Sequence, residues 1–178
     1  MEKNKKIAFL IVAGGTGNRF GSTTPKQYQI LQGRTILQHS IECALSHPNI
    51  TDIQCVIRKE DGLLYKHMAK AFPKKLHPAV TGGKNRQDSA RKGLEALKEL
   101  APDFVLIHDA ARPFLSHALI DRLLVALTKN KAAIPVLSMS DTIKQKTDDT
   151  SLKTLDRTSL YAVQTPQAFD YSLIMQLH

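Results

Sequence analysis

Residues 7–13 read Ile-Ala-Phe-Leu-Ile-Val-Ala and run directly into Gly14-Gly15, without a polar side chain in between. A strand in the middle of a parallel sheet is buried on both faces, so it has this unbroken apolar character, whereas a strand with one wet face alternates. The run is far shorter than the roughly 20 apolar residues that cross a bilayer. We therefore interpret residues 7–13 as the first strand of an α/β sheet and expect no membrane partner.

Downstream of this strand, segments with helical and strand periodicity alternate. Helices are predicted from Thr35 to near Pro48 and over residues 61–72, 85–101 and 116–129, with a last one starting at Asp170; strands are predicted over 52–58, 79–81, 104–108 and 132–137. Thr35 and Gln38 have the spacing of a capping box. Alternating strands and helices are typical of a doubly wound sheet. We expect an α/β fold with a Rossmann-like, doubly wound, mostly parallel sheet in a single domain over residues 1–178.

The pattern changes at residues 141–160, which are polar and have little to bury in a core. Asp148-Asp149 is a turn candidate, so this segment is predicted to be a projecting β-hairpin arm. Such an arm is either a solvated excursion or a device that pairs with a second copy of the chain.

Charge and cysteine content narrow the partners and the compartment. Twenty-five Lys and Arg against 16 Asp and Glu give a formal charge of +9, which favours anionic partners. We expect no nucleic acid among them, because the chain has no Trp and its Phe and Tyr are dispersed. The basic residues before Ile7 resemble a secretory signal, but no small-x-small cleavage site follows. Cys43 and Cys55 lie in apolar segments and form no metal motif, so we expect free thiols and a cytoplasmic protein.

Ligands of open α/β sheets bind beyond the carboxyl ends of the strands. The first such loop starts at Gly14-Gly15 and brings two cations, Arg19 and Lys26. Its small residues let backbone N–H groups approach a polyphosphate. It is neither GxGxxG, because Phe20 stands where the last Gly would be, nor GxxxxGK[ST]. The alternative is a tight turn with exposed cations.

Two further loops carry polar residues. Gly82-Gly83 precedes Arg86 and Ser89 near a predicted helix start, where backbone donors and a hydroxyl could read a base or phosphate, or form only a turn and cap. Residues 108–113, His-Asp-Ala-Ala-Arg-Pro, end a buried strand. Asp109 could hold Mg²⁺ and Arg112 could grip phosphate, or the two could form a local ion pair. We assign His108 no role. Together the three loops suit phosphoryl or nucleotidyl transfer.

Six motifs carry a resemblance to a known family. They are AGGTGNRFG at residues 13–21, PKQY at 25–28, GGKNRQDS at 82–89, HDAARPF at 108–114, DTIK at 141–144 and LDRTSLYAVQTPQAF at 155–169. In this order they resemble the 2-C-methyl-D-erythritol 4-phosphate cytidylyltransferases. The resemblance implies an enzyme that joins CTP to methylerythritol phosphate, releases pyrophosphate, needs Mg²⁺ and serves non-mevalonate isoprenoid synthesis.

The resemblance also implies roles for residues. The catalytic group would be Arg19, Lys26 and Arg157, of which Arg19 and Lys26 stabilise the pentavalent phosphate. The site for cytidine and triphosphate would be lined by Ala13, Gly14, Gly15, Gly83 and Ser89. Asp109 would lie beside the metal and the sugar. The methylerythritol phosphate would be addressed by Arg112, Thr142, Arg157 and Thr165. In the family the arm crosses to a partner subunit, which implies a homodimer in which Thr142 and Arg157 complete the neighbour's site.

Two departures from the family keep alternatives open. The family continues beyond QTPQ with a segment bearing a lysine and an acid, and the sequence ends before either, so we expect a domain truncated at its C-terminus. An inactive nucleotide-binding or assembly fragment is one alternative, and some members continue into a cyclodiphosphate synthase domain. The first loop reads Ala13-Gly14-Gly15, the spelling of the related ribitol-5-phosphate cytidylyltransferases, which makes ribitol 5-phosphate the alternative acceptor.

Overall fold

A computed structural model of the chain describes residues 5–15, 24–73 and 75–178. Its centre is a six-stranded sheet in the order β5-β4-β1-β6-β12-β7. These strands are β5 (Val80–Thr81), β4 (Asp52–Ile57), β1 (Ile7–Ala13), β6 (Phe104–Asp109), β12 (Gln167–Asp170) and β7 (Ala132–Ala133). The first four run parallel, and β12 runs antiparallel to both of its neighbours. The α/β, doubly wound and mostly parallel sheet expected from the sequence is thus confirmed.

Strand β1 lies in the middle of the parallel part, between β4 and β6. Its side chains alternate between the two faces of the sheet, and both faces are covered. Phe9 belongs to one apolar cluster and Leu10 to the other, and both are fully buried. Residues 7–13 therefore form the two-faced central strand that their apolar run predicts.

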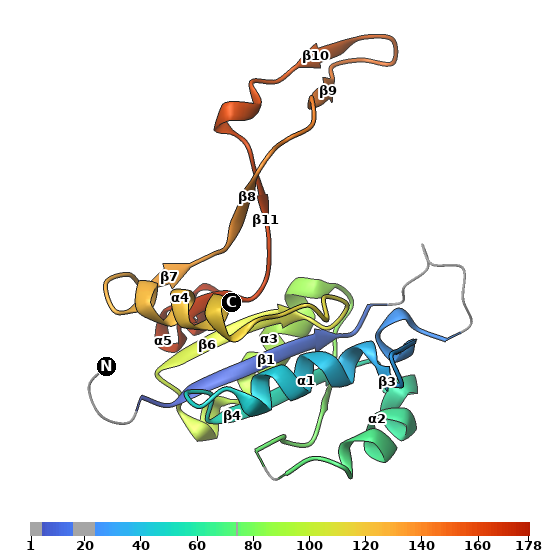
Figure 1. Cartoon of the computed structure of the whole chain (residues 1–178), viewed down its shortest axis with the longest axis vertical. Coiled ribbons are helices and arrows are strands. Elements are labelled where there is room, and N and C mark those ends of the chain that lie inside the picture. The colour runs from blue at the N-terminus through green and yellow to red at the C-terminus, as the bar shows by residue number, and fades with distance from the viewer. Residues whose placement is uncertain (1–4, 16–23, 74) are drawn as a thin grey trace.

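Helices cover both faces (Figure 1). One apolar cluster joins β1 to α1 (Ile36–Ser46), α2 (Gly62–Ala69) and α4 (His117–Leu127), and the other joins it to α3 (Arg86–Ala96) and α5 (Tyr171–Leu177). Helix α1 begins with the predicted capping box, in which Thr35 and Gln38 bond each other's backbone N–H. Asn85, Ser116 and Asp170 cap α3, α4 and α5, at the positions where these helices were predicted to start. Two short strands, β2 (Ile30–Leu31) and β3 (Arg34–Thr35), pair ahead of α1.

Strand β12 was not expected, and the predicted strand over residues 132–137 is wrong as a single buried element. Only β7 joins the sheet, and after Pro135 the chain leaves it as β8 (Val136–Ser138). Proline has no N–H for a ladder bond, so it favours a break here. Val136 and Leu137, which look like core residues, are exposed. Burial in this sheet therefore does not explain why these two residues are apolar.

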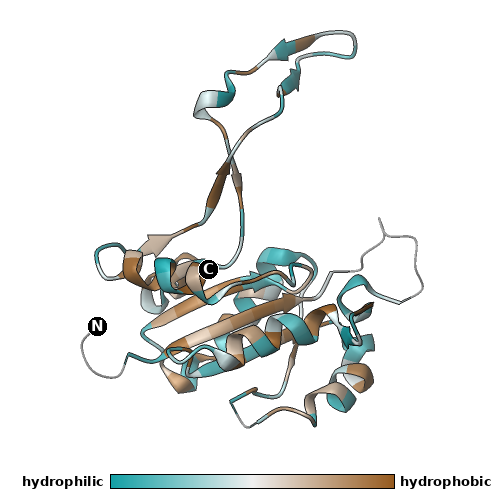
Figure 2. Cartoon of the chain, in the orientation of Figure 1, coloured by the Kyte–Doolittle hydropathy of each residue, from teal (hydrophilic) through white to brown (hydrophobic). Residues whose placement is uncertain are grey.

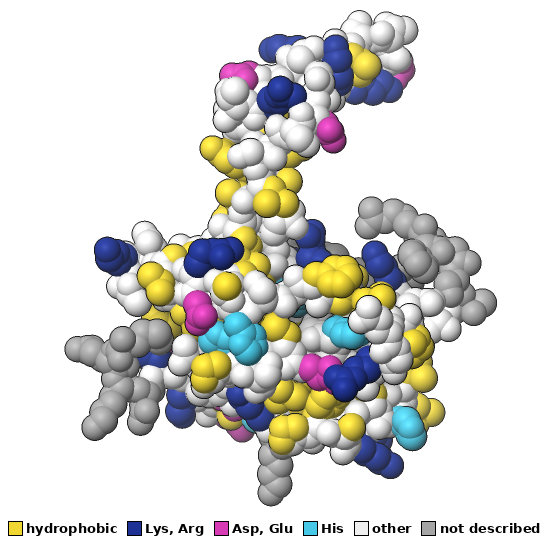
Figure 3. Space-filling view, viewed as in Figure 1, with side chains coloured by type: hydrophobic (Ala, Val, Ile, Leu, Met, Phe, Trp, Pro, Cys, Tyr) yellow, Lys and Arg dark blue, Asp and Glu magenta, His cyan; other side chains and the backbone are white. Residues whose placement is uncertain are grey.

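The arm extends further than the predicted residues 141–160. It begins with β8 paired to β11 (Tyr161–Val163) and continues as β9 (Lys144–Lys146) paired to β10 (Leu152–Thr154). Figure 1 shows it projecting away from the sheet, and Figure 2 shows apolar residues in β8. In Figure 3 apolar side chains gather on the stalk, while Lys and Arg side chains gather towards the tip. We call the β8–β11 ribbon the stalk; its exposed apolar side chains are Val136, Leu137, Tyr161 and Val163.

Both cysteines are free, as expected. Burial raises the pKa of the Cys55 thiol to about 12 and also raises the pKa of Cys43. Since the thiolate is the nucleophile, neither residue suits covalent catalysis. Among the described residues, no helix has the length and apolar character that crossing a membrane requires.

Candidate active site

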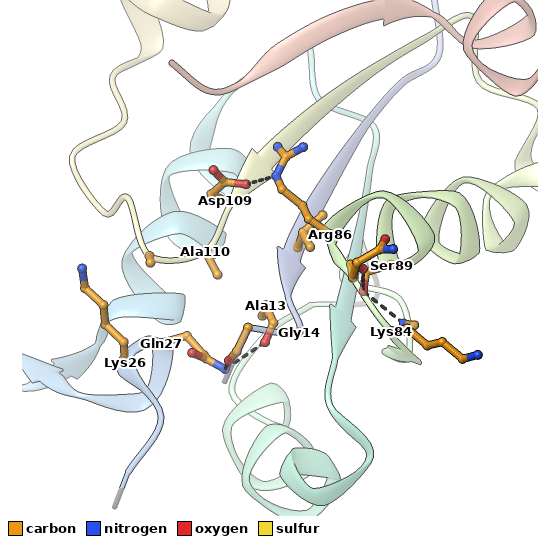
Figure 4. Close-up of a pocket in the computed structure, with 14 residues that line it drawn as sticks. Ala13, Gly14, Lys26, Gln27, Lys84, Arg86, Ser89, Asp109 and Ala110 are labelled. Carbon is orange, nitrogen blue, oxygen red and sulfur yellow. Dashed lines mark hydrogen bonds and ion pairs between the residues drawn. The ribbon is translucent and has the colours of Figure 1, made fainter. Parts of the chain in front are cut away.

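A pocket of about 730 Å³ opens at the carboxyl edge of the parallel strands. Three segments that follow strands line it: the end of β1 through Gly15, residues 83–86 after β5, and residues 109–111 at the end of β6. The 3-10 helix η2 (Lys26–Tyr28) adds Lys26 and Gln27. Figure 4 shows these residues converging on one space. The site lies where ligands of open α/β sheets bind.

The first wall consists of Ala13, Gly14 and Gly15. A Cβ at Gly14 would lie 3.3 Å from the Ser89 hydroxyl oxygen, which brings the first and second loops together. The Gln27 side-chain amide donates to the Ala13 carbonyl at 2.8 Å and to the Gly15 carbonyl at 3.3 Å. The loop is therefore held from behind by a residue that the sequence reasoning did not single out.

The second wall is the turn into α3. Ser89 Oγ accepts a hydrogen bond from the Gly83 N–H at 3.0 Å and donates one to the Asn85 carbonyl at 2.8 Å. A Cβ at Gly83 would fall 1.8 Å from an Asp88 carboxylate oxygen, so only glycine fits there. Both predicted residues, Gly83 and Ser89, line the pocket. The hydroxyl of Ser89 orders the turn.

The third wall carries the charge. Asp109 Oδ1 accepts a hydrogen bond from Arg86 Nε at 2.8 Å, and Asp109 Oδ2 lies 3.6 Å from Arg112 Nε. Arg112 also donates to the side chain of Gln164 and is absent from the pocket lining. The sequence suggested the pairing of Asp109 with Arg112; the shorter contact with Arg86 was missed because the two residues are 23 positions apart.

His108, to which the sequence reasoning gave no role, ties this wall together from inside the fold. It is 1% exposed; its Nε2 donates to the Arg112 carbonyl at 3.0 Å, and its Nδ1 accepts from the Thr165 hydroxyl at 3.0 Å. Thr165 Oγ1 in turn accepts from the Asp109 N–H at 3.3 Å. Burial lowers the pKa of His108 to about 4, so the ring is neutral at neutral pH. The predicted substrate residue Thr165 thus binds two residues of β6, and His108 connects β6 to the loop that carries Arg112.

The charges that line the described part of the pocket are Lys26, Lys84 and Arg86 against Asp109. Their balance favours an anionic ligand. Mg²⁺ is usually held by one or two carboxylates together with substrate phosphates and waters, so a single carboxylate at this position fits it. No group of three or more His, Cys, Asp or Glu in the described chain could hold a metal by itself.

Two of the predicted residues lie on the arm. Thr142 and Arg157 are exposed on the arm, where an Arg157 Nη1 donates to the Ser140 carbonyl at 2.6 Å. They are not among the residues that line the pocket, and whether they complete a neighbour's site stays a prediction. Arg19 falls within residues 16–23, outside the described residues. The other predicted lining residues do share one space: Ala13, Gly14, Gly15, Lys26, Gly83, Ser89 and Asp109.

Fold and pocket together define a class. A Rossmann-like sheet, glycine turns at two strand ends, several cations and one carboxylate make an α/β domain suited to binding a polyphosphate for group transfer.

Comparisons with known proteins give the family. The model of the family described as "IspD: 2-C-methyl-D-erythritol 4-phosphate cytidylyltransferase" matches residues 7–178. The chain is 47% identical over 173 residues to the bifunctional enzyme IspD/IspF of Rhodospirillum rubrum, which covers 97% of this chain and 45% of that protein. Its structure is similar to that of 4-diphosphocytidyl-2C-methyl-D-erythritol synthase from Anaerococcus prevotii, with a TM-score of 0.84 and 33% identity over 97% of this chain and 74% of the other. It is also similar to the bifunctional IspDF from Campylobacter jejuni, with a TM-score of 0.78 and 26% identity over 96% of this chain and 42% of that one.

The chain belongs to the 2-C-methyl-D-erythritol 4-phosphate cytidylyltransferase family, a family of nucleotidyltransferases. The resemblance found in the motifs is confirmed. The chain spans less than half the length of the first curated relatives that it matches.

Proposed function

We propose that this domain transfers CMP from CTP to 2-C-methyl-D-erythritol 4-phosphate and releases pyrophosphate, a step of non-mevalonate isoprenoid synthesis. The observation that carries the proposal is one pocket in which Gly14, Gly83, Lys26 and Asp109 meet at the carboxyl edge of the sheet. Family membership adds the identity of the nucleotide and of the acceptor.

The chemistry requires positioning and charge more than a covalent intermediate. An oxygen of the acceptor phosphate attacks the α-phosphorus of CTP while the bond from that phosphorus to the bridging oxygen breaks, so both electrons of that bond leave with pyrophosphate. Negative charge builds on the oxygens of the five-coordinate phosphorus. Lys26 stabilises that charge from the pocket wall as a fixed cation, and Arg19 takes the same role by its place in the motif.

We also propose Mg²⁺ as the metal cofactor of this transfer. When bound, it would neutralise charge on the triphosphate, with Asp109 as its protein carboxylate. For Asp109 to bind a metal, its 2.8 Å contact with Arg86 must loosen or be shared. Arg86 then becomes available to a phosphate.

The acceptor site is proposed to form between two copies of the chain. Arg112 and Thr165 both contact Asp109, and the arm of a second copy would bring Thr142 and Arg157. Supporting this homodimer are the exposed apolar side chains of the stalk, which an isolated solvated arm would not need. The free cysteines are consistent with a cytoplasmic enzyme, which we propose as well.

Pyrophosphate release tests the function directly. We expect the purified protein, given CTP and Mg²⁺, to release pyrophosphate with methylerythritol phosphate and far more slowly with ribitol 5-phosphate. Faster turnover of ribitol 5-phosphate would replace the acceptor and leave the nucleotide chemistry intact. Calorimetric binding of CTP without turnover of either acceptor would instead favour a non-catalytic nucleotide-binding fragment.

A further inference from the structure

Behind the first wall of the pocket lies a network of hydrogen-bonded polar side chains: Gln27, Asp61 and Arg58. Gln27 is 5% exposed and Asp61 is 2% exposed. Gln27 Nε2, which binds the Ala13 and Gly15 carbonyls, lies 3.4 Å from Asp61 Oδ2. Arg58 Nη2 donates to Asp61 Oδ1 at 2.6 Å, and Arg58 Nε donates to Asp61 Oδ2 at 3.1 Å. This hydrogen-bond network thus connects Arg58, which follows β4, to the end of β1.

Asp61 occupies the N-cap position of α2, but its side chain does not cap the helix. An aspartate at an N-cap normally accepts a hydrogen bond from an N–H in the first turn of the helix. Here the carboxylate is used by Arg58 and Gln27 instead. A buried carboxylate is costly unless it is paired and hydrogen-bonded, and Arg58 provides both. The geometry favours a bracing role over helix capping.

The orientation of the loop carbonyls has a consequence for an anion. Carbonyl oxygens that faced the pocket would repel a phosphate, whereas N–H groups would attract it. Gln27 accounts for the carbonyls of both Ala13 and Gly15, so neither faces a ligand unpaired. Gln27 also directly follows Lys26 in η2, so the residue that fixes the loop fixes the position of the cation (Figure 4).

We propose that Gln27, braced by Asp61 and Arg58, is the positioning residue that holds the glycine loop and Lys26 in register for the triphosphate. The inference rests on the proposed function, since it assigns these residues to the same pocket. The proposed role is structural: the Gln27 amide donates to two carbonyls. Neither Gln27 nor Asp61 transfers a proton to the substrate or forms a covalent bond with it.

The decisive variant is Gln27→Glu, which keeps the length and shape of the side chain but replaces the amide, with its two N–H donors, by a carboxyl group beside Asp61. We expect kcat/KM for CTP to fall about 10- to 100-fold, because small displacements of positioning groups cost that much. KM for CTP should rise while KM for the acceptor changes less than about 2-fold. A general loss of folded protein lowers the apparent kcat and leaves both KM values unchanged, so it does not produce this split. Gln38→Glu is the matched control: there only the side-chain oxygen is used, accepting from the Thr35 N–H, so activity should stay at the parent level.

A double variant separates positioning from stability. Gln27→Glu combined with Asp61→Asn removes the repulsion between two carboxylates, so the Tm lost in the single variant should recover in part. A carboxyl group has at most one donor hydrogen, so it cannot serve the Ala13 and Gly15 carbonyls together, and kcat/KM for CTP should stay low. Recovery of Tm and kcat/KM together would show that Gln27 acts only through stability and would overturn the proposal.

Calorimetry with CTP and Mg²⁺ keeps this inference distinct from the proposed function. If the parent protein turns over and Gln27→Glu, still folded, turns over equally well, the positioning role is overturned and the function stands. If the parent binds CTP without turnover, the function fails, and weaker binding to Gln27→Glu than to Gln38→Glu still supports the positioning role. If the parent does not bind CTP at all, both proposals are overturned.

Discussion

The pocket and the arm differ in what supports them: the pocket rests on the buried core, whereas the arm projects into solvent. The pocket is set on a sheet whose central strand is fully covered by helices on both faces, so its walls inherit fixed positions from the core. The arm has no core of its own: the described side chains of β8, β9 and β10 are all exposed, including apolar ones. The described walls of the pocket all come from one chain and rest on its own core. An apolar stalk held out in solvent indicates a surface that is completed by another molecule.

Of the substitutions that compare the pocket with the arm, Lys26→Ala in the pocket is expected to have the largest effect on kcat. Removing a fixed cation from the developing charge should lower kcat on the order of 100-fold or more. Steady-state pyrophosphate release measures it. The matched change on the arm is Lys146→Ala, which removes a cation paired with Asp149 near the tip and should alter kcat less than about 2-fold. Equal losses in the two variants would contradict the division of roles.

The second prediction uses pH to probe the pocket wall. Burial lowers the pKa of His108 from 6.5 to about 4, so between these values the unfolded chain binds a proton that the folded chain does not. The free energy of unfolding should therefore fall as pH drops through this window, by up to about 3 kcal/mol from His108. Urea denaturation at several pH values measures it.

His47 contributes with the same sign, because burial lowers its pKa too. The control is therefore His108→Gln, which keeps a donor for the Arg112 carbonyl but does not titrate. Its stability should depend less on pH than that of the parent over this window. An unchanged pH dependence would show that His108 is not the group responsible.

The third prediction concerns the packing that supports the pocket. A Cβ at Gly93 on α3 would lie 2.4 Å from Leu10 and 2.7 Å from Val56, so Gly93→Ala overpacks the helix against the sheet. We expect a loss of about 1–3 kcal/mol in the free energy of unfolding. Gly62→Ala on α2 is the matched control, since its Cβ meets nothing within 4 Å, and it should stabilise the helix by up to about 1 kcal/mol. Chemical denaturation of both variants tests the sign of each change.

The smallest effect on folding is expected on the stalk. Leu137 is 60% exposed, so Leu137→Asp should change the free energy of unfolding of the globular part by less than about 0.5 kcal/mol. The same substitution should shift the protein from dimer to monomer in sedimentation velocity, because it places a charge in the proposed contact. A variant that remains dimeric would remove the stalk from the interface.

The sequence predicted the sheet and the pocket better than it predicted the arm. Local signals were sufficient for β1, with its apolar run, and for the caps Thr35 and Asn85, because they depend on neighbours in the chain. Strand β12 was missed because Gln167–Asp170 is short and its partners β6 and β7 lie far away in the sequence. The apolar residues 136 and 137 were misread for a related reason: periodicity reports what is apolar, not which molecule covers it.

The site shows the same division. Residues with a sequence signature, such as Gly14, Gly83 and Asp109, were found, and they do line one pocket. The contact between Arg86 and Asp109 was not found because it joins segments whose proximity only the sheet order reveals. The bracing of the loop by Gln27 was not found because its side chain binds carbonyls 12 and 14 positions earlier in the chain. The PKQY segment could have drawn attention to Gln27, since that residue lies beside the predicted Lys26.

The central claim is that one catalytic site is divided between the pocket of one copy and the arm of another. Its most direct test is the pyrophosphate-release activity of a mixture of two inactive variants, Lys26→Ala and Arg157→Ala, after their subunits have exchanged. In a mixed dimer one site carries both defects and the other carries none, so random exchange should restore about a quarter of the parent activity. A mixture that stays as inactive as its components would contradict the shared site.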